Sequence, residues 1–194
     1  MSKKNTAIFI FEDVEVLDFT GPFEVFSVTN QLSDYSLMNI YIVAEKKEVI
    51  TAKNGLSVNP DYAMNEAPTP DILIVPGGRG TRPLLQNVSV IEWIRNRAES
   101  AERVLSVCTG SLLLAQAGIL DGLRATTHHL AFEELKQAGP NVEILKNERF
   151  VDNGKVVTSA GVSAGIDMSL HVIGSMYDQQ TAQKTAAHME YRMI

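Results

Sequence analysis

Short, continuously apolar runs alternate with segments of helical spacing along most of this chain. Residues 6–11, 71–75 and 104–107 are such runs, and each is followed by turn-forming residues or by a helical pattern. A continuous apolar run is typical of a strand that is buried on both faces of a sheet. The alternation therefore predicts an α/β fold with a mostly parallel central sheet and helices on both faces.

Helical spacing, Asn-Gly turns and a Gly-Pro stop place the remaining elements. We expect helices at 18–32, 88–98, 112–117, 130–138, 166–176 and 181–191. Strands are expected at 40–44 and 124–127, and hairpins at 46–58 and 149–158, which turn at Asn54-Gly55 and Asn153-Gly154. No repeat or linker interrupts this pattern, so a single domain over 1–194 is expected.

Composition narrows the class of protein. The 194 residues are 45% hydrophobic and 21% charged, with a net charge of −6 and no run of Lys or Arg, so no nucleic-acid partner is expected. The apolar run at 6–11 is too short for a secretory leader or a membrane span. One cysteine excludes an internal disulfide. We expect a soluble cytoplasmic protein with no membrane partner.

Cys108, the only cysteine, lies at a predicted strand-to-helix corner. The strand 103–107 precedes it, and Thr109-Gly110-Ser111 leads into a helix. A free cysteine is often just a small buried hydrophobe. A helix N-terminus, however, points backbone N–H groups at the sulfur and favours the thiolate. The setting therefore indicates a nucleophile.

Three other segments end at the same predicted sheet edge. Asp18 follows the first strand and is the candidate proton carrier, although an N-cap would explain it as well. The amide of Gly78, together with that of Thr109, could form an oxyanion hole, and a simple tight turn is the alternative. His128 ends the strand 124–127 and could pair with the sulfur. No residues have metal-ligand spacing, so no metal is expected.

Four segments together resemble one family. They are LDFTGPFEVF at 17–26, VPGG at 75–78, SVCTGS at 106–111 and AGVSAGID at 160–167. In this order they are similar to motifs of the ThiJ/PfpI superfamily, whose domains are class I glutamine-amidotransferase-like. The resemblance implies a flavodoxin-like three-layer sandwich with a cysteine at a strand-to-helix elbow. It also implies a homodimer.

Thr109 after the cysteine, and Asp18 within Asp-Phe-Thr-Gly-Pro, resemble the isonitrile hydratase branch of this superfamily. That likeness implies a lyase without a cofactor, which converts an isonitrile, a small-molecule substrate, to an N-substituted formamide. Cys108 would be the nucleophile, Asp18 the acid and base, and Thr109 a supporting hydrogen-bond donor. His128 matches a third position in some branches and is a weaker candidate.

Two alternatives stay open. The same pattern occurs in the sensor half of some AraC-type regulators, so the chain could be a redox or reactive-carbonyl sensor or a small-molecule-binding module. No helix-turn-helix half is expected in these 194 residues. A glyoxalase or deglycase acting on 2-oxoaldehydes is the second alternative, and there His128 should matter.

Overall fold

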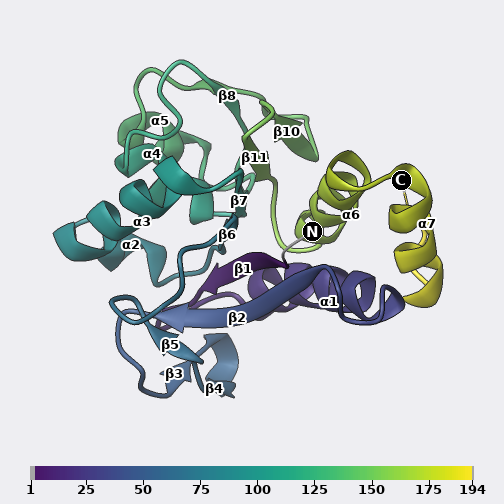
Figure 1. Cartoon of the computed structure of the whole chain (residues 1–194). Helices are drawn as coiled ribbons and strands as arrows, with labels where there is room; N and C mark the ends of the chain where they lie inside the picture. The colour runs from purple at the N-terminus through teal and green to yellow at the C-terminus, as the bar shows by residue number, and fades with distance from the viewer. Residues whose placement is uncertain (1–2, 194) are drawn as a thin grey trace.

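A seven-stranded sheet in the order β10-β11-β7-β6-β1-β2-β5 forms the centre of the computed structural model, which describes residues 3–193 (Figure 1). Its strands are β1 (Lys4–Phe9), β2 (Met38–Ala44), β5 (Tyr62–Ala63), β6 (Ile72–Val75), β7 (Arg103–Val107), β10 (Phe150–Asp152) and β11 (Val156–Ser159). All neighbours pair in parallel except β10 and β11, which form an antiparallel hairpin at one edge. The predicted mostly parallel α/β sheet is confirmed.

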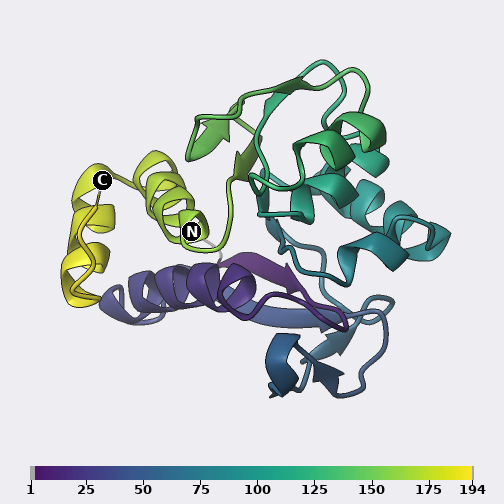
Figure 2. The same ribbon diagram turned by 180° about the vertical axis from the view of Figure 1, so that it is seen from behind.

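Helices cover both faces of the sheet. On one face α1 (Val16–Leu32), α6 (Ala164–Met176) and α7 (Gln179–His188) pack against one another. The other face carries α2 (Thr81–Leu84), α3 (Val88–Ser100), α4 (Gly110–Gln116) and α5 (Phe132–Ala138). Figures 1 and 2 show the two helical groups separated by the sheet. This arrangement confirms the predicted three-layer sandwich.

The second half of β1 lies in the core. This strand lies between β2 and β6, and the helical layers cover its two faces, so Ala7, Ile8 and Phe9 are fully buried. Burial of a large apolar side chain such as Ile8 contributes about 2 kcal/mol. The ring of Phe9 also packs against those of Phe11 and Trp93, at centroid distances of 5.8 and 5.4 Å. The apolar run at residues 6–11 therefore forms most of a central, fully covered strand of the sheet.

Two small strand pairs lie outside this sheet. The first joins β3 (Ile50–Thr51) to β4 (Ser57–Val58) through a short 3-10 turn, η1 (Lys53–Gly55). Asn54 and Gly55 have φ values of 63° and 89° there, which confirms the predicted turn. The second pair is β8 (Arg124–Ala125) with β9 (Glu143–Ile144).

The predicted strand at 124–127 is therefore shorter than expected and does not belong to the central sheet. After Ala125 the backbone no longer pairs with another strand. The Thr126 amide instead donates to the side chain of Thr158 on β11, with 3.0 Å between the nitrogen and Oγ1. A hydroxyl can replace a ladder bond at one position but cannot continue a strand. The argument that His128 ends a strand of the main sheet is accordingly wrong.

Helix α1 begins at Val16, two residues before the predicted start. Glu15 occupies the N-cap position and makes no side-chain capping bond, while Pro22 lies in the second turn and not the first. Asp18 is thus the third residue of the helix, and capping does not account for it. Among residues 3–193, no helix is both long enough and apolar enough to cross a bilayer.

Candidate active site

Cys108 stands at the corner between β7 and α4, in a left-handed conformation with φ of 56°. Its amide donates to the carbonyls of Ser159 and Ala160, at 3.2 and 3.1 Å. Its carbonyl accepts bonds from the hydroxyls of Thr127 and Ser111, at 2.9 and 3.1 Å. A non-glycine residue in this region costs about 1–3 kcal/mol. Contacts from three segments hold it there.

Two glycines let the surrounding turns come close to the cysteine. A Cβ on Gly110 would collide with the carbonyl oxygen of Val75, so the start of α4 packs directly on the end of β6. A Cβ on Gly77 would lie 2.5 Å from the Thr109 amide nitrogen and 2.8 Å from Asp18 Oδ2. Gly77 is therefore the point at which the turns after β6 and β7 meet the first turn of α1.

The Asp18 carboxylate is fully buried beside the thiol. Its Oδ2 accepts the Gly77 amide at 3.1 Å, and the Cys108 thiol lies next to the carboxylate and lowers its pKa. Within the described residues Oδ1 has no partner of regular hydrogen-bond geometry. Burial is the main reason that the pKa of Asp18 rises to about 7. This carboxyl can therefore both take and give a proton near neutral pH.

Burial also raises the pKa of the Cys108 thiol to about 12, and the negative charge of Asp18 adds to the rise. The backbone N–H groups of Thr109 and Val162 act on the sulfur in the opposite direction. The Thr109 amide at the start of α4 does favour the thiolate, as expected, but it does not set the net pKa of the thiol. Desolvation and the neighbouring carboxylate outweigh the two amides, so the resting sulfur is a protonated thiol that needs a base in order to react.

Thr109 holds the glycine turn in place with its side chain. Its Oγ1 accepts the Gly78 amide at 3.0 Å and also lies 3.2 Å from the Gly78 carbonyl and 3.3 Å from Thr81 Oγ1. The predicted use of the Gly78 amide in an oxyanion hole does not match this geometry, because that N–H already donates to the threonine. The amide of Thr109, in contrast, faces the sulfur as expected.

Val162 is a site residue that the sequence reasoning missed. Its amide faces the Cys108 sulfur, and its φ of 48° is rare for a β-branched residue. It lies in the segment 160–167 that contributed to the family resemblance. The small residues on either side of it indicate a turn, and nothing else in the local sequence points to a functional role. Backbone strain beside a reactive group is typical of functional sites.

Lys53 is a second missed residue. It lies in the turn between β3 and β4, where its Nζ is 2.6 Å from Glu15 Oε2 and its amide donates to Val14. The charges of the pair act on the pKa of Asp18 in opposite directions, Glu15 raising it and Lys53 lowering it. Nothing in the sequence linked this hairpin to the cysteine.

His128 lies near these loops but is not joined to the sulfur by any hydrogen bond between described residues. Its ring packs against Gly161, where a Cβ would be 2.5 Å from Cδ2, and stacks on His129 at 4.3 Å. Its Nδ1 accepts the Leu130 amide at 3.3 Å, and burial lowers its pKa. The structure thus joins Asp18, Cys108 and Thr109 and leaves His128 beside them.

The two remaining histidines, His171 and His188, lie on α6 and α7. His171 bonds to Asp152 at 2.7 Å on the surface, and His188 is exposed near the end of α7. From residue 3 to residue 193, no group of three His, Cys, Asp or Glu side chains is placed to hold a metal ion.

Residues 4–175 match the DJ-1/PfpI family. The chain is 35% identical to isonitrile hydratase of Pseudomonas putida, over 94% of this chain and 76% of that protein. It is 28% identical to the HTH-type transcriptional regulator GbdR of Pseudomonas aeruginosa over 95% of its length, which corresponds to half of the regulator. A ThiJ/PfpI family protein from Pseudomonas syringae has a similar structure. Its TM-score is 0.89 at 29% identity, and the match covers 100% of this chain and 77% of that one.

Proposed function

This chain belongs to the DJ-1/PfpI family, and on that premise we propose that it hydrates an isonitrile to an N-substituted formamide, with Cys108 as the nucleophile. One observation carries the proposal: a fully buried carboxyl with a pKa of about 7 lies beside the only thiol. The similarity to isonitrile hydratase supports this choice of substrate.

In the first step Asp18 takes the proton from the Cys108 thiol while the sulfur attacks the terminal carbon of the isonitrile. Asp18 then returns the proton to that same carbon. The carbon gains one bond to sulfur and one to hydrogen, and the product is a thioimidate attached to the enzyme. Oδ1 of Asp18 is suited to this proton transfer, because it accepts no hydrogen bond from any described residue.

In the second step water adds to the thioimidate carbon, and Asp18 moves a proton from the water to the substrate nitrogen. The tetrahedral adduct collapses, its carbon–sulfur bond breaks, and the hydroxyl proton returns to the sulfur. The formamide leaves with the atoms of one water added. Neither step requires a cofactor.

The backbone amides of Thr109 and Val162 would stabilise the sulfur as its negative charge develops. Both already face it in the resting state, so little reorganisation accompanies the reaction. The Thr109 hydroxyl acts indirectly, because it positions the Gly77-Gly78 turn that in turn binds Asp18.

The test measures formamide production from a panel of aryl and alkyl isonitriles. We expect Cys108→Ser and Asp18→Asn each to lower kcat/KM by about 100-fold or more, the effect of removing a nucleophile or an acid–base group. Asp71→Asn is the matched control, because Asp71 precedes β6 at the opposite end of the strand and accepts the Asn5 amide. Full activity of Cys108→Ser would refute the proposal.

A small-molecule or redox sensor is the second candidate, supported by the similarity to one half of a transcriptional regulator. Oxidation also proceeds through the thiolate, so the redox version would likewise need Asp18 to take the thiol proton. Intact-mass measurement after mild peroxide treatment separates the two. Rapid, complete oxidation at Cys108, without turnover of any isonitrile, would favour the sensor.

Deglycase chemistry on 2-oxoaldehydes would also pass through Cys108, and there His128 should contribute. Methylglyoxal belongs in the same activity screen, with His128→Ala beside the wild type. Because no hydrogen bond joins His128 to the sulfur within residues 3–193, we expect this variant to keep its isonitrile activity.

Two further proposals follow from the family resemblance. We expect a homodimer, and sedimentation that shows only a 21.3 kDa species would exclude it. We also place the protein in the cytoplasm, where reducing conditions keep a catalytic thiol available. Cell fractionation tests the location.

A further inference from the structure

The Gly77-Gly78 turn after β6 supplies a backbone hydrogen bond to Asp18, from the Gly77 amide at 3.1 Å. Two consecutive glycines have wide backbone freedom, so the direction of this N–H depends on the contacts that hold the turn. Thr109 Oγ1 holds the turn on one side, by accepting the Gly78 amide at 3.0 Å. The contacts of the Gly78 carbonyl play no part in the proposed reaction so far.

The first two residues of α2, Thr81 and Arg82, both donate to the Gly78 carbonyl. Thr81 is fully buried, and its Oγ1 lies 2.8 Å from the carbonyl oxygen. Nη1 of Arg82 lies 3.1 Å from the same oxygen. We call these two contacts the Gly78 clamp. The Thr81 hydroxyl is also 3.3 Å from Thr109 Oγ1, so the clamp adjoins the side chain that holds the Gly78 amide.

Helix α5 fixes the other end of the Arg82 side chain. Nε and Nη2 of Arg82 each lie 2.8 Å from one carboxylate oxygen of Glu134. A bidentate pair sets the plane and direction of a guanidinium, and here it leaves Nη1 directed at the Gly78 carbonyl. Because the pair is exposed, it contributes little to stability by itself. Its value to the protein is the geometry that it gives to the clamp.

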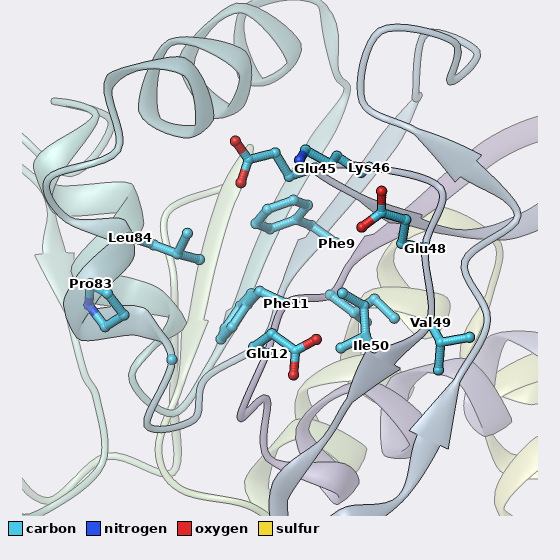
Figure 3. Close-up of a pocket in the computed structure, with 12 residues that line it drawn as sticks. Phe9, Phe11, Glu12, Glu45, Lys46, Glu48, Val49, Ile50, Pro83 and Leu84 are labelled. Carbon is cyan, nitrogen blue, oxygen red and sulfur yellow. The ribbon is translucent and has the colours of Figure 1, made fainter.

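Packing alone holds α2 weakly. The helix is four residues long, too short to be stable through its own backbone bonds. Figure 3 shows Pro83 and Leu84 of α2 on one side of a cavity of about 280 Å³, with Ile50 on the other. The wall of a cavity lacks partner atoms on that side, so its position depends on its remaining contacts. The Gly78 clamp therefore fixes α2 and the glycine turn to each other.

We propose that Thr81 and Arg82 are positioning residues for proton transfer by Asp18, because they fix the Gly78 carbonyl and thereby the turn whose Gly77 amide binds the carboxylate. This role rests on the proposed function, in which Asp18 carries the proton. Without the clamp the backbone at Gly78 gains freedom, and the Gly77 N–H spends part of its time away from Oδ2.

The expected consequence has a definite sign. The Gly77 N–H lowers the pKa of Asp18, so its partial loss should raise that pKa above about 7. Three titratable groups also act on this carboxyl: Glu15 from the start of α1, Lys53 from η1 and Cys108 from the corner between β7 and α4. The variants described next leave all three in place.

NMR of protein with isotopically labelled aspartate carboxyl groups follows the titration of Asp18 without any substrate, and Asp18→Asn identifies the signal. We expect Thr81→Val, which keeps the shape of the side chain, to raise the titration midpoint by about 0.5–1 pH unit, since part of one hydrogen bond to a charged group is lost. Thr81→Ser keeps a hydroxyl and should restore the midpoint. Thr185→Val is the matched control, because it removes another fully buried threonine hydroxyl, one that bonds to Thr29 at 2.8 Å.

Arginine variants test the other half of the clamp. Arg82→Met should move the midpoint in the same direction as Thr81→Val. Arg82→Lys should recover only part of the difference, because one ammonium cannot bind the Gly78 carbonyl and both oxygens of Glu134 at once. Arg95→Met is the matched control, since Arg95 is an exposed arginine that donates to a backbone carbonyl elsewhere, that of Ala117, at 2.9 Å.

Formamide production at pH 7 then measures the effect on the reaction. We expect kcat/KM to fall by about 10-fold in Thr81→Val and to return in Thr81→Ser. If the wild type converts no isonitrile, the proposed function fails, while the substrate-free titration still decides whether the clamp positions the turn at Asp18. An unchanged midpoint in both Thr81→Val and Arg82→Met, an equal shift in Thr185→Val, or full recovery in Arg82→Lys would overturn the proposal.

Discussion

Asp18 and Asp167 are both buried carboxylates in the first turn of a helix, and the two helices, α1 and α6, pack together. Their neighbours differ. Asp167 accepts bonds from the Arg149 guanidinium and, at 2.8 Å, from the Tyr191 hydroxyl. Asp18 has one amide, a thiol and an unpartnered oxygen. A buried carboxylate with a cation and a hydroxyl stabilises the fold, whereas one without a cation is available for proton transfer.

The largest effect should come from the pH dependence that Asp18 imposes on stability. Its pKa is about 7 in the folded chain against an ordinary value of 3.8, so folding favours the protonated form. Wild-type stability should therefore fall as the pH rises from about 4 to 7, by up to about 4 kcal/mol. Asp18→Asn resembles the protonated form and lacks this loss. Urea unfolding at pH 5 and pH 8 measures the difference between the two proteins.

The sign of that result is decisive. Asp18→Asn should be more stable than the wild type at pH 8 and nearly equal to it at low pH, although it loses activity. A variant that is less stable than the wild type at pH 8 would mean that the carboxylate is satisfied in the fold. The contrast with Asp167 would then disappear.

Asp167 should behave in the opposite way. Asp167→Asn keeps the shape of the side chain but removes the charge that Arg149 faces, and Arg149 also bonds to Ser163 at 3.1 Å. Because the arginine is partly exposed, we expect a loss of only about 2 kcal/mol. Urea unfolding at pH 7 measures it, and an increase in stability would contradict the assignment of Asp167 to a structural role.

The smallest effect is expected at Val162, which lies between the surroundings of Cys108 and those of Arg149 and Asp167 in the chain. It precedes Ser163 in the chain, and its own amide faces the sulfur. Val162→Gly would relieve the positive φ and keep the N–H group, so a gain of about 1 kcal/mol is expected. Thermal unfolding compared with Val172→Gly, a buried helical valine that should lose stability, measures the effect. A loss of stability in Val162→Gly would show that the position is not strained.

Much of the fold could be predicted because its signals are local. The buried strand β1, the Asn54-Gly55 turn and the corner at Cys108 each follow from a few adjacent residues. The strand at 124–127 could not be judged in this way. Its two-residue remnant pairs with β9, and no local pattern distinguishes that pairing from a place in the main sheet.

The candidate site was predicted in part. Asp18, Cys108 and Thr109 do lie together, whereas the Gly78 amide is used by Thr109 and His128 is bonded elsewhere. The direction of a backbone N–H depends on the turn that contains it, and the sequence indicates only that a turn is present. Val162 could not be predicted for the same reason, because it acts on the Cys108 sulfur through its backbone amide.

The sequence by itself determined where most strands of the central sheet lie and that a lone cysteine follows one of them, because apolar runs and small turn residues act over a few neighbouring positions. Only the tertiary structure decided the chemistry of that cysteine. Burial and the charge of Asp18, which is distant in the chain, raise the pKa of the thiol and oppose the amides at the helix start. Desolvation depends on everything packed around a group, so it is settled only when the whole sheet and its helices have assembled.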